Sequence, residues 1–553
     1  MGEKIKKAIG VKGDFKTAIL PMINYSYANM FMGGAGYIIS MYFTIFLTDV
    51  VGMELKKAGL VVMIATLWDA VTDPAMGIIT DRTRSATGKH RRYLLIGIPV
   101  LFVAYTLLWN SYGVSPKMAV VYYTLVYMLY KTAFTIVSVP HTAMLPELAP
   151  EYDLRTQYNS MGYLFNSAGM VPSFLFTALI LFIFGSNDDL TPESKKPFLV
   201  VGIVLSIFYS ISVFLTYRNT RERSSLNNVN EPFDLKYLLR EYALVFKNKS
   251  FRQYFFMSVA YQFSTGFYNN TKVYYIKYLA NQYKMYALFN AVAGVAEASA
   301  FPFNYAMTMK HGKKKCGNIV TPLRVAGLAL GLFMQKNTPG SAMNVFWIVL
   351  MMASMILYPF GMSGLGFVST NIFPDLTDVD ELITGRRREG VISTFSTLIK
   401  KSIAGVMAAI VTFILQSFGL VTGPQVKEYE SATGELFSQS AKAIFGVRIC
   451  VAIIPIVAAV VSLLLLRNFK MNKDDHTMIR AAVATKHKYG NVALTDEEIK
   501  TIEQVSGQKF EKTWLGKDND TANGHALDKN EDGEYIILIE LEEENAKLLS
   551  HKE

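Results

Sequence analysis

The stretch Trp68-Asp69-Ala70-Val71-Thr72-Asp73-Pro74 places two carboxylates inside a long apolar run, which leads into the basic turn Gly88-Lys89-His90-Arg91-Arg92. On a helix, Asp69 and Asp73 share one face with about 5–6 Å between their Cβ atoms, and like charges at that distance are unfavourable unless a cation lies between them. Inside a membrane each charged side chain costs about 2.5–3.5 kcal/mol. The spacing therefore predicts a cation site on a membrane helix, with neutralisation by a neighbour such as Arg82 or Arg84 as the alternative.

The composition of the whole chain is that of a polytopic membrane protein. Its 553 residues are 51% hydrophobic and only 18% charged, and the charges gather in short clusters between apolar runs. The formal net charge is +11, but the basic residues lie at the ends of apolar runs, as the positive-inside rule predicts, rather than on one basic face. We therefore expect a lipid bilayer as partner and no nucleic acid. The two cysteines lie in or beside apolar runs and predict no disulfide framework.

About twelve apolar runs of roughly twenty residues predict membrane-spanning helices. The predicted fold is an all-α membrane protein with two six-helix bundles at 1–217 and 253–467, a cytoplasmic linker at 218–252 and a polar cytoplasmic tail at 468–553. Basic residues gather in the connections of one side, so both termini are expected in the cytoplasm and the protein in the cell membrane. Within the tail, a Thr-Asp-Glu-Glu capping pattern predicts a short amphipathic helix over 495–505. The rest of the tail is expected to lie outside the bundle.

Three motifs, in order along the chain, resemble the glycoside–pentoside–hexuronide:cation symporter family of the major facilitator superfamily. They are Trp68 to Arg92, Pro140 to Thr156 and Pro374 to Gly390. The resemblance covers roughly residues 15 to 470 and implies the twelve-helix major-facilitator fold, with solute and ion sites between its two halves. It also implies secondary active symport coupled to Na⁺ or H⁺. No cofactor is expected.

The resemblance assigns a cation site where residues match the family. Asp69 and Asp73 correspond to the carboxylate pair that holds sodium, lithium or a proton, and they are the expected metal ligands if the ion is sodium. Thr135, on the fourth span, would add a hydroxyl oxygen, which suits a hard cation. Lys401, on the eleventh span, corresponds to a lysine near the cavity.

The sugar-binding positions of the family do not match. Gly33, Ser138 and Gly162 stand where the family has two acids and one arginine, while Lys131 adds a positive charge to the fourth span. A substrate carboxylate would suit that balance, or Lys131 could pair with an acid. Polar and aromatic residues near the expected cavity are candidate substrate contacts: Lys131, Tyr130, Tyr27, Asn166, Tyr268, Lys272 and Lys401.

Two further groups of charged residues have structural interpretations. Glu297 and Arg324, within the eighth and ninth spans, are expected to form a buried structural pair. Charged residues at the cytoplasmic helix ends are expected to hold one conformation closed, as a gate: Asp81, Arg82, Arg155, Asp378, Arg386 and Arg387.

The predicted function is symport that couples inward movement of Na⁺ or H⁺ to uptake of a sugar or glycoside, with an anionic hexuronide as one candidate. A sodium-coupled lysolipid carrier of the same superfamily is an alternative, and so is a solute sensor that does not transport. The chain shows no Gly-rich phosphate loop and no nucleophile and base arrangement, so no enzyme is expected.

Overall fold

The structure is a computed structural model, and the residues that it describes are 19–81, 83, 88, 90–149, 152–184, 194–221, 240, 243–333, 342–386, 388–434, 437–521, 523–529 and 535. Arg82, Arg387 and most of the expected linker at 218–252 lie outside the described residues. Asp81 and Arg155 are placed as helix residues, but their side chains are not described.

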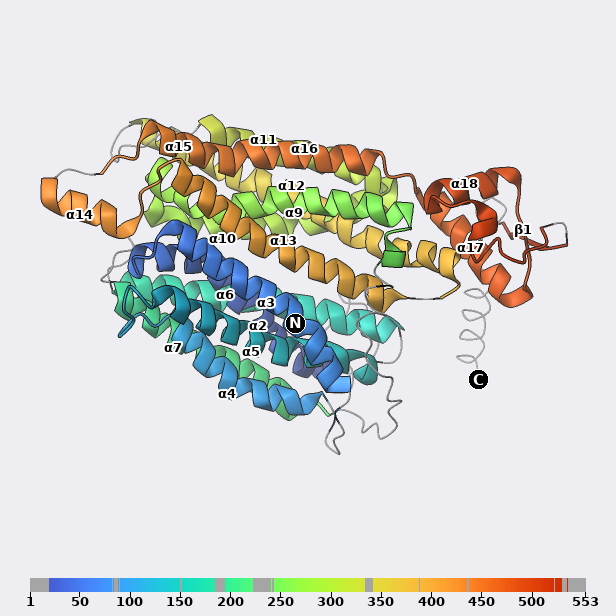
Figure 1. Ribbon diagram of the computed structural model, residues 1–553, viewed down its shortest axis with the longest axis horizontal. Helices are drawn as coiled ribbons and strands as arrows, with labels where there is room; N and C mark the ends of the chain where they lie inside the picture. The colour runs from blue at the N-terminus through green and yellow to red at the C-terminus, as the bar shows by residue number, and fades with distance from the viewer. Residues whose placement is uncertain are drawn as a thin grey trace.

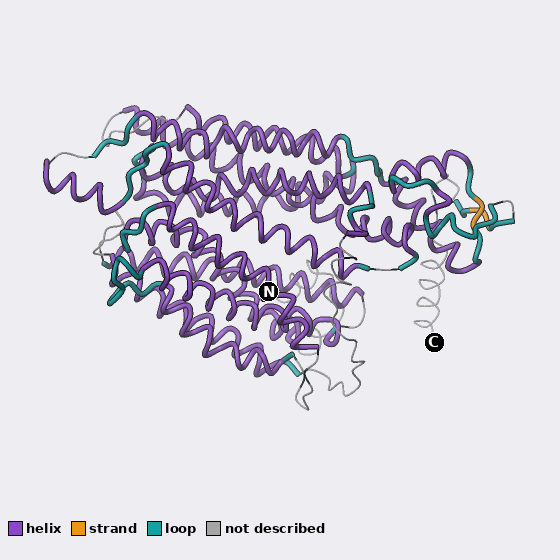
Figure 2. Tube along the Cα trace, viewed as in Figure 1, coloured by secondary structure: helices purple, strands orange, loops and turns teal. Residues whose placement is uncertain are grey.

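Long helices make up both halves of the chain (Figures 1 and 2). The first half contains α2 (Leu20–Ile38), continued by π-helical turns at Ile39–Phe43 and Phe46–Val50, then α3 (Leu55–Asp81), α4 (Arg91–Leu108), α5 (Ala119–Leu148), α6 (Tyr152–Ile183) and α7 (Lys195–Asn219). The second half contains α9 (Lys249–Tyr274), continued by a π-helical turn at Tyr275–Leu279, then α10 (Tyr286–His311), α11 (Lys313–Phe333), α12 (Ala342–Thr384), α13 (Glu389–Ser417), α14 (Gly423–Thr433), α15 (Ala441–Arg448) and α16 (Ile454–Arg467).

Within the described residues, nine helical stretches are long and apolar enough to cross a membrane. The prediction of an all-α membrane protein is therefore confirmed, while the number of twelve spans stays a prediction. The stretches at α2, α9 and α10 do not meet the same criterion. Polar residues that line internal cavities lower the hydropathy of two of these helices. They are Gln262, Asn269 and Lys272 on α9, and Asn290 and Glu297 on α10.

Helices α3 and α13 form the main contact between the two halves (Figure 1). Glycines allow the close approach: a Cβ atom on Gly59 would lie 1.9 Å from Thr412 Oγ1, and one on Gly405 would lie 2.8 Å from Thr66 Cβ. Small residues commonly permit such packing between membrane helices. This crossing sets Asp69 and Asp73 of α3 opposite Lys401 of α13.

The described part of the tail is folded and packs against the bundle. It contains α17 (Lys473–Tyr489), α18 (Asp496–Ser506) and a two-residue parallel strand pair, β1 (Val492–Ala493) with β2 (His525–Ala526). Helix α18 confirms the amphipathic helix expected over 495–505, and Thr495 and Glu498 form its capping box. The expectation that the tail lies outside the bundle is wrong, because its apolar side chains share one buried cluster with the ends of α9 and α12 (right in Figure 1).

Candidate functional site

Two carboxylates and two lysines meet at the contact between the halves. Lys401, from α13, forms ion pairs with both acids of α3, and its Nζ lies 3.0 Å from Asp69 Oδ2. Lys131, from α5, places its Nζ 3.4 Å from the same oxygen. Asp69 is only 2% exposed, so it depends on these partners. The repulsion between the acids is therefore relieved by two lysines, and the cluster carries no net formal charge.

Thr135 lies between the two acids, and its role as a cation ligand stays a prediction. Its Oγ1 lies 2.8 Å from Asp73 Oδ1 and 3.3 Å from Asp69 Oδ1, so its one hydroxyl hydrogen is donated to Asp73 at the shorter distance. Thr72 Oγ1 lies 3.3 Å from Thr135 Oγ1. Carboxylate and hydroxyl oxygens of this kind are the ligands that hard cations prefer. The sequence analysis did not single out Thr72, although it lies three residues after Asp69 on the same helix face.

A cavity of about 380 Å³ adjoins this cluster. Its walls come from both halves: Tyr130, Lys131 and Phe134 of α5 face Thr265 and Asn269 of α9. Tyr130 is therefore placed at the cavity, as expected, and Lys131 belongs to both the cavity and the charged cluster. A second cavity, of about 270 Å³, lies between α2, α9, α10 and α12 and is lined by Tyr268 and Lys272.

Close helix packing fills the region where the resemblance would put a sugar. A Cβ atom on Gly33 of α2 would lie 2.5 Å from Asn166 Oδ1 of α6, and one on Gly162 would lie 3.0 Å from Asn29 Nδ2. Tyr27 also faces α6, where its ring meets Phe165 edge to face at 5.5 Å. Tyr27 and Asn166 are not among the residues that line the two cavities. Their role in substrate binding stays a prediction.

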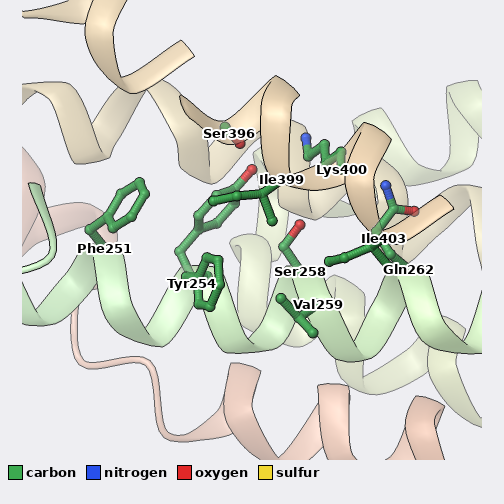
Figure 3. A pocket seen from close by; sticks show the side chains of 10 residues that line it. Phe251, Tyr254, Ser258, Val259, Gln262, Ser396, Ile399, Lys400 and Ile403 are labelled. Atoms are coloured by element: carbon green, nitrogen blue, oxygen red, sulfur yellow. The ribbon is translucent and has the colours of Figure 1, made fainter. Parts of the chain in front are cut away.

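A narrow crevice continues from the larger cavity between α9 and α13. Figure 3 shows Phe251, Tyr254 and Ser258 of α9 facing Ser396 and Ile399 of α13 across it. Its volume is only about 10 Å³, and Gln262 lines both the crevice and the cavity. The crevice has room for no more than about one water molecule. Packing of α9 against α13 thus closes this side of the cavity to solutes.

An ion pair joins the two halves of the chain beside α14. Asp49, fully buried after α2, accepts a hydrogen bond from Lys277 Nζ at 2.5 Å and another from Tyr278 Oη at 3.1 Å. The Gly423 N–H donates to Tyr278 Oη at 3.3 Å, and Tyr286 Oη donates to the Met41 carbonyl at 3.3 Å. The contacts of Asp49 and Met41 join the first half to the second, and that of Gly423 holds Tyr278 within the second half. No local pattern in the sequence predicts this pair, because Asp49 and Lys277 lie 228 residues apart.

The acids expected at the cytoplasmic gate contact the tail and their own half of the chain. Asp378 lies 2.8 Å from His476 Nε2 and 3.8 Å from Arg480 Nε, both on α17. Arg386 is exposed, and its backbone N–H donates to Thr384. Other acids of α12 have similar partners: Asp375 with Lys313, Asp380 with Arg388, and Glu381 with His487. The gating role of Asp81, Arg82, Arg155, Asp378, Arg386 and Arg387 stays a prediction.

The expected pair between Glu297 and Arg324 does not form. Arg324 is fully buried and lies over two rings, 5.0 Å from the centroid of Tyr261 and 5.5 Å from that of Tyr358. Within the described residues its guanidinium nitrogens make no hydrogen bond. Glu297 instead lines the second cavity together with Lys272. The prediction of a structural pair is wrong because the aromatic rings, rather than the carboxylate, surround the guanidinium group.

Together, the long apolar helices in two packed halves and the polar cavities with buried charges define a multi-pass membrane transporter of the major-facilitator type. Residues 24–473 match the family described as "MFS/sugar transport protein". The chain belongs to this family, and within it to the glycoside–pentoside–hexuronide:cation symporters. It is a transporter rather than an enzyme.

Relatives with assigned names support this placement. The isoprimeverose transporter of Lactiplantibacillus pentosus is 24% identical over 83% of this chain and 90% of its own length. The glucuronide carrier protein homolog of Escherichia coli is 23% identical over 77% of this chain and 85% of its own. Among solved structures, the nucleoside transporter NupG covers 82% of this chain and 100% of its own at a TM-score of 0.54 and 14% identity, which supports the fold alone.

Proposed function

We propose that this protein is a secondary active symporter that couples inward movement of Na⁺ or H⁺ to uptake of a sugar or glycoside. The observation that carries the proposal is the cluster of Asp69, Asp73 and Lys401 at the contact between two helical halves, beside cavities of solute size. Relatives named for isoprimeverose and for glucuronide support a sugar as the solute.

The lysine between the acids suggests how coupling works. A sodium ion needs the oxygens of Asp69, Asp73 and Thr135, which is the place that the Lys401 ammonium now occupies. Cation binding would displace the ammonium, and a proton would release it by neutralising an acid. Because α3 and α13 belong to different halves, releasing Lys401 removes an ion pair that joins them. The cation therefore changes both the charge of the site and the contact between the halves.

The orientation of the protein follows from the charge distribution. With basic connections on the cytoplasmic side of a cell membrane, the tail faces the cytoplasm and the ion pair of Asp49 with Lys277 closes the outer side. Alternating access would require that outer contact to open.

The pairing of Lys131 removes the main argument for an anionic hexuronide. That argument needed an unpaired ammonium in the cavity, and Lys131 lies 3.4 Å from Asp69. A lysolipid carrier is also less favoured, because polar side chains such as Lys131, Gln262 and Asn269 line the larger cavity, where an acyl chain would need apolar walls.

The packed tail favours a second candidate, a solute sensor. The contact of His476 and Arg480 with Asp378 would let a change in the bundle reach the tail. Purified protein in liposomes separates the two functions. A symporter exchanges labelled sugar across the membrane and concentrates it under a cation gradient, whereas a sensor binds sugar without either.

A further inference from the structure

The second cavity has features of a binding site in its own right. It lies between α2, α9, α10 and α12, with a volume of about 270 Å³. Ser40 and Asn269 line both cavities, so the two adjoin each other. Together they reach the range of about 300–1,000 Å³ typical of ligand pockets. The second cavity thus lies beside the cation cluster but is built mainly from the second half of the chain.

Two opposite charges line this cavity without neutralising each other by direct contact. Lys272 Nζ donates to Asn290 Oδ1 at 2.5 Å, which uses one of its three hydrogens. Within the described part of the chain, no hydrogen bond or ion pair engages the Glu297 carboxylate, and none joins it to Lys272. Lys272 lies on α9 and Glu297 on α10, and a charge inside a membrane bundle is costly unless it has a function. The cavity therefore presents one donor group and one acceptor group to a ligand.

Aromatic rings form the rest of the wall. Tyr268 and Tyr358 lie with their ring centroids 3.8 Å apart, and Tyr37 and Tyr286 line the same cavity. The Arg324 guanidinium group makes a cation–π contact with the Tyr358 ring. Rings of this kind can cover the apolar face of a pyranose, while charged groups reach its hydroxyls. A wall of tyrosines with a few convergent polar groups is typical of a small-molecule site.

We propose that this second cavity binds the transported solute, and that the solute is an uncharged sugar or glycoside. Lys272 would donate to hydroxyl oxygens of the ligand, and Glu297 would accept from its hydroxyl groups. The two formal charges cancel, and those of the cation cluster cancel as well. A uronide carboxylate in this cavity would lie near the Glu297 carboxylate, and two like charges in a low-dielectric site repel each other. This inference rests on the proposed sugar transport and names its solute class and its site.

Binding to the purified full-length protein tests the inference. The probes are a panel of uncharged 4-nitrophenyl glycosides and 4-nitrophenyl β-D-glucuronide, and the readout is the dissociation constant from equilibrium dialysis. Glu297→Gln and Lys272→Met should each weaken binding of an uncharged glycoside about tenfold, as expected for loss of a charged hydrogen-bonding partner. The surface pair Glu54 and Lys57, 57% and 50% exposed, supplies matched controls, because Glu54→Gln and Lys57→Met should leave the dissociation constant unchanged.

Three results would overturn the inference. They are unchanged affinity in both cavity variants, binding of the glucuronide alone, or binding of no sugar in the panel. Sugar uptake driven by a cation gradient is measured in parallel, so the proposed symport can stand even when this site assignment fails. If either cavity variant aggregates, Asn290→Ser is used instead, because it removes the partner of Lys272 and keeps both charges. This variant should raise the dissociation constant for uncharged glycosides more than twofold, and an unchanged dissociation constant would again contradict the inference.

Discussion

Replacing Lys401 by methionine removes the ammonium group that bridges the two acids of α3. Its Nζ lies 3.0 Å from Asp69 Oδ2, a distance at which two unit charges attract by about 5–6 kcal/mol at an effective dielectric constant of about 20. Desolvation offsets much of this attraction, and the lysine side chain is 26% exposed. A sodium ion must displace the Lys401 ammonium, so the net attraction between Lys401 and the acids opposes sodium binding. If that net attraction is about 1.4 kcal/mol, Lys401→Met should bind sodium about tenfold more tightly. Without sodium the variant should be less stable, because Lys131 alone then faces two carboxylates.

Thermal unfolding of the purified protein measures both effects. The unfolding midpoint is followed over a sodium chloride titration, with choline chloride to hold ionic strength, at pH 7.5 and pH 5.5. If the coupling ion is a proton, the acids of Lys401→Met should take up that proton at a higher pH. The rise in unfolding midpoint on acidification should then begin at a higher pH than in the unmodified protein. Lys400→Met is the matched control, since Lys400 lines the crevice of Figure 3 and forms no ion pair within the described residues. A Lys401→Met variant with the same sodium and pH responses as the unmodified protein would refute this reasoning.

Other residues give independent predictions. Asp69→Asn and Asp73→Asn should each abolish cation-driven uptake while counterflow persists, and uptake at the unmodified rate in both would contradict the cation site. Asp49→Asn should lower stability by about 1.5–3 kcal/mol, because it removes a charged hydrogen-bond partner of Lys277 from a buried ion pair. Adding Lys277→Met should restore part of that stability, and equal stability of the single and double variants would argue against the pair. Trp514→Ala should lower the unfolding midpoint, because the indole packs on Gly385 at the end of α12; an unchanged midpoint would show that tail packing contributes no stability.

The helices were predictable because membrane crossing imposes a length and an apolar composition that local sequence records. The apolar run that contains Asp69 and Asp73 became α3 at Leu55–Asp81, and the run that carries Lys401 became α13 at Glu389–Ser417. Helix α12 continues to Thr384, well into the polar motif Pro374 to Gly390. The last turns of α12 carry acidic residues, so they lack the apolar composition that predicts a membrane span. Partners in the tail, which are distant in sequence, stabilise them.

The acid pair of the site was predictable from its spacing on one helix, whereas Thr135 and Lys401 were expected near it only through the family resemblance. The hydrogen bond of Lys401 to Asp73 joins residues 328 positions apart, and no local pattern encodes such a contact. The folded tail was missed for a related reason. Its apolar residues Met478, Ile479 and Ala482 are spaced as on one helix face, but they are few among charged neighbours and are buried only because α12 provides the other surface.

Uptake into proteoliposomes tests the central claim of cation-coupled sugar transport most directly. Liposomes that contain the purified protein are given labelled isoprimeverose or a labelled uncharged glycoside from the panel, under an imposed sodium gradient, proton gradient or neither. Symport predicts accumulation of at least one sugar above its external concentration under one gradient, with loss of accumulation in Asp69→Asn. Equilibration of every sugar to the external concentration under all conditions, or uptake unaffected by Asp69→Asn, would contradict it.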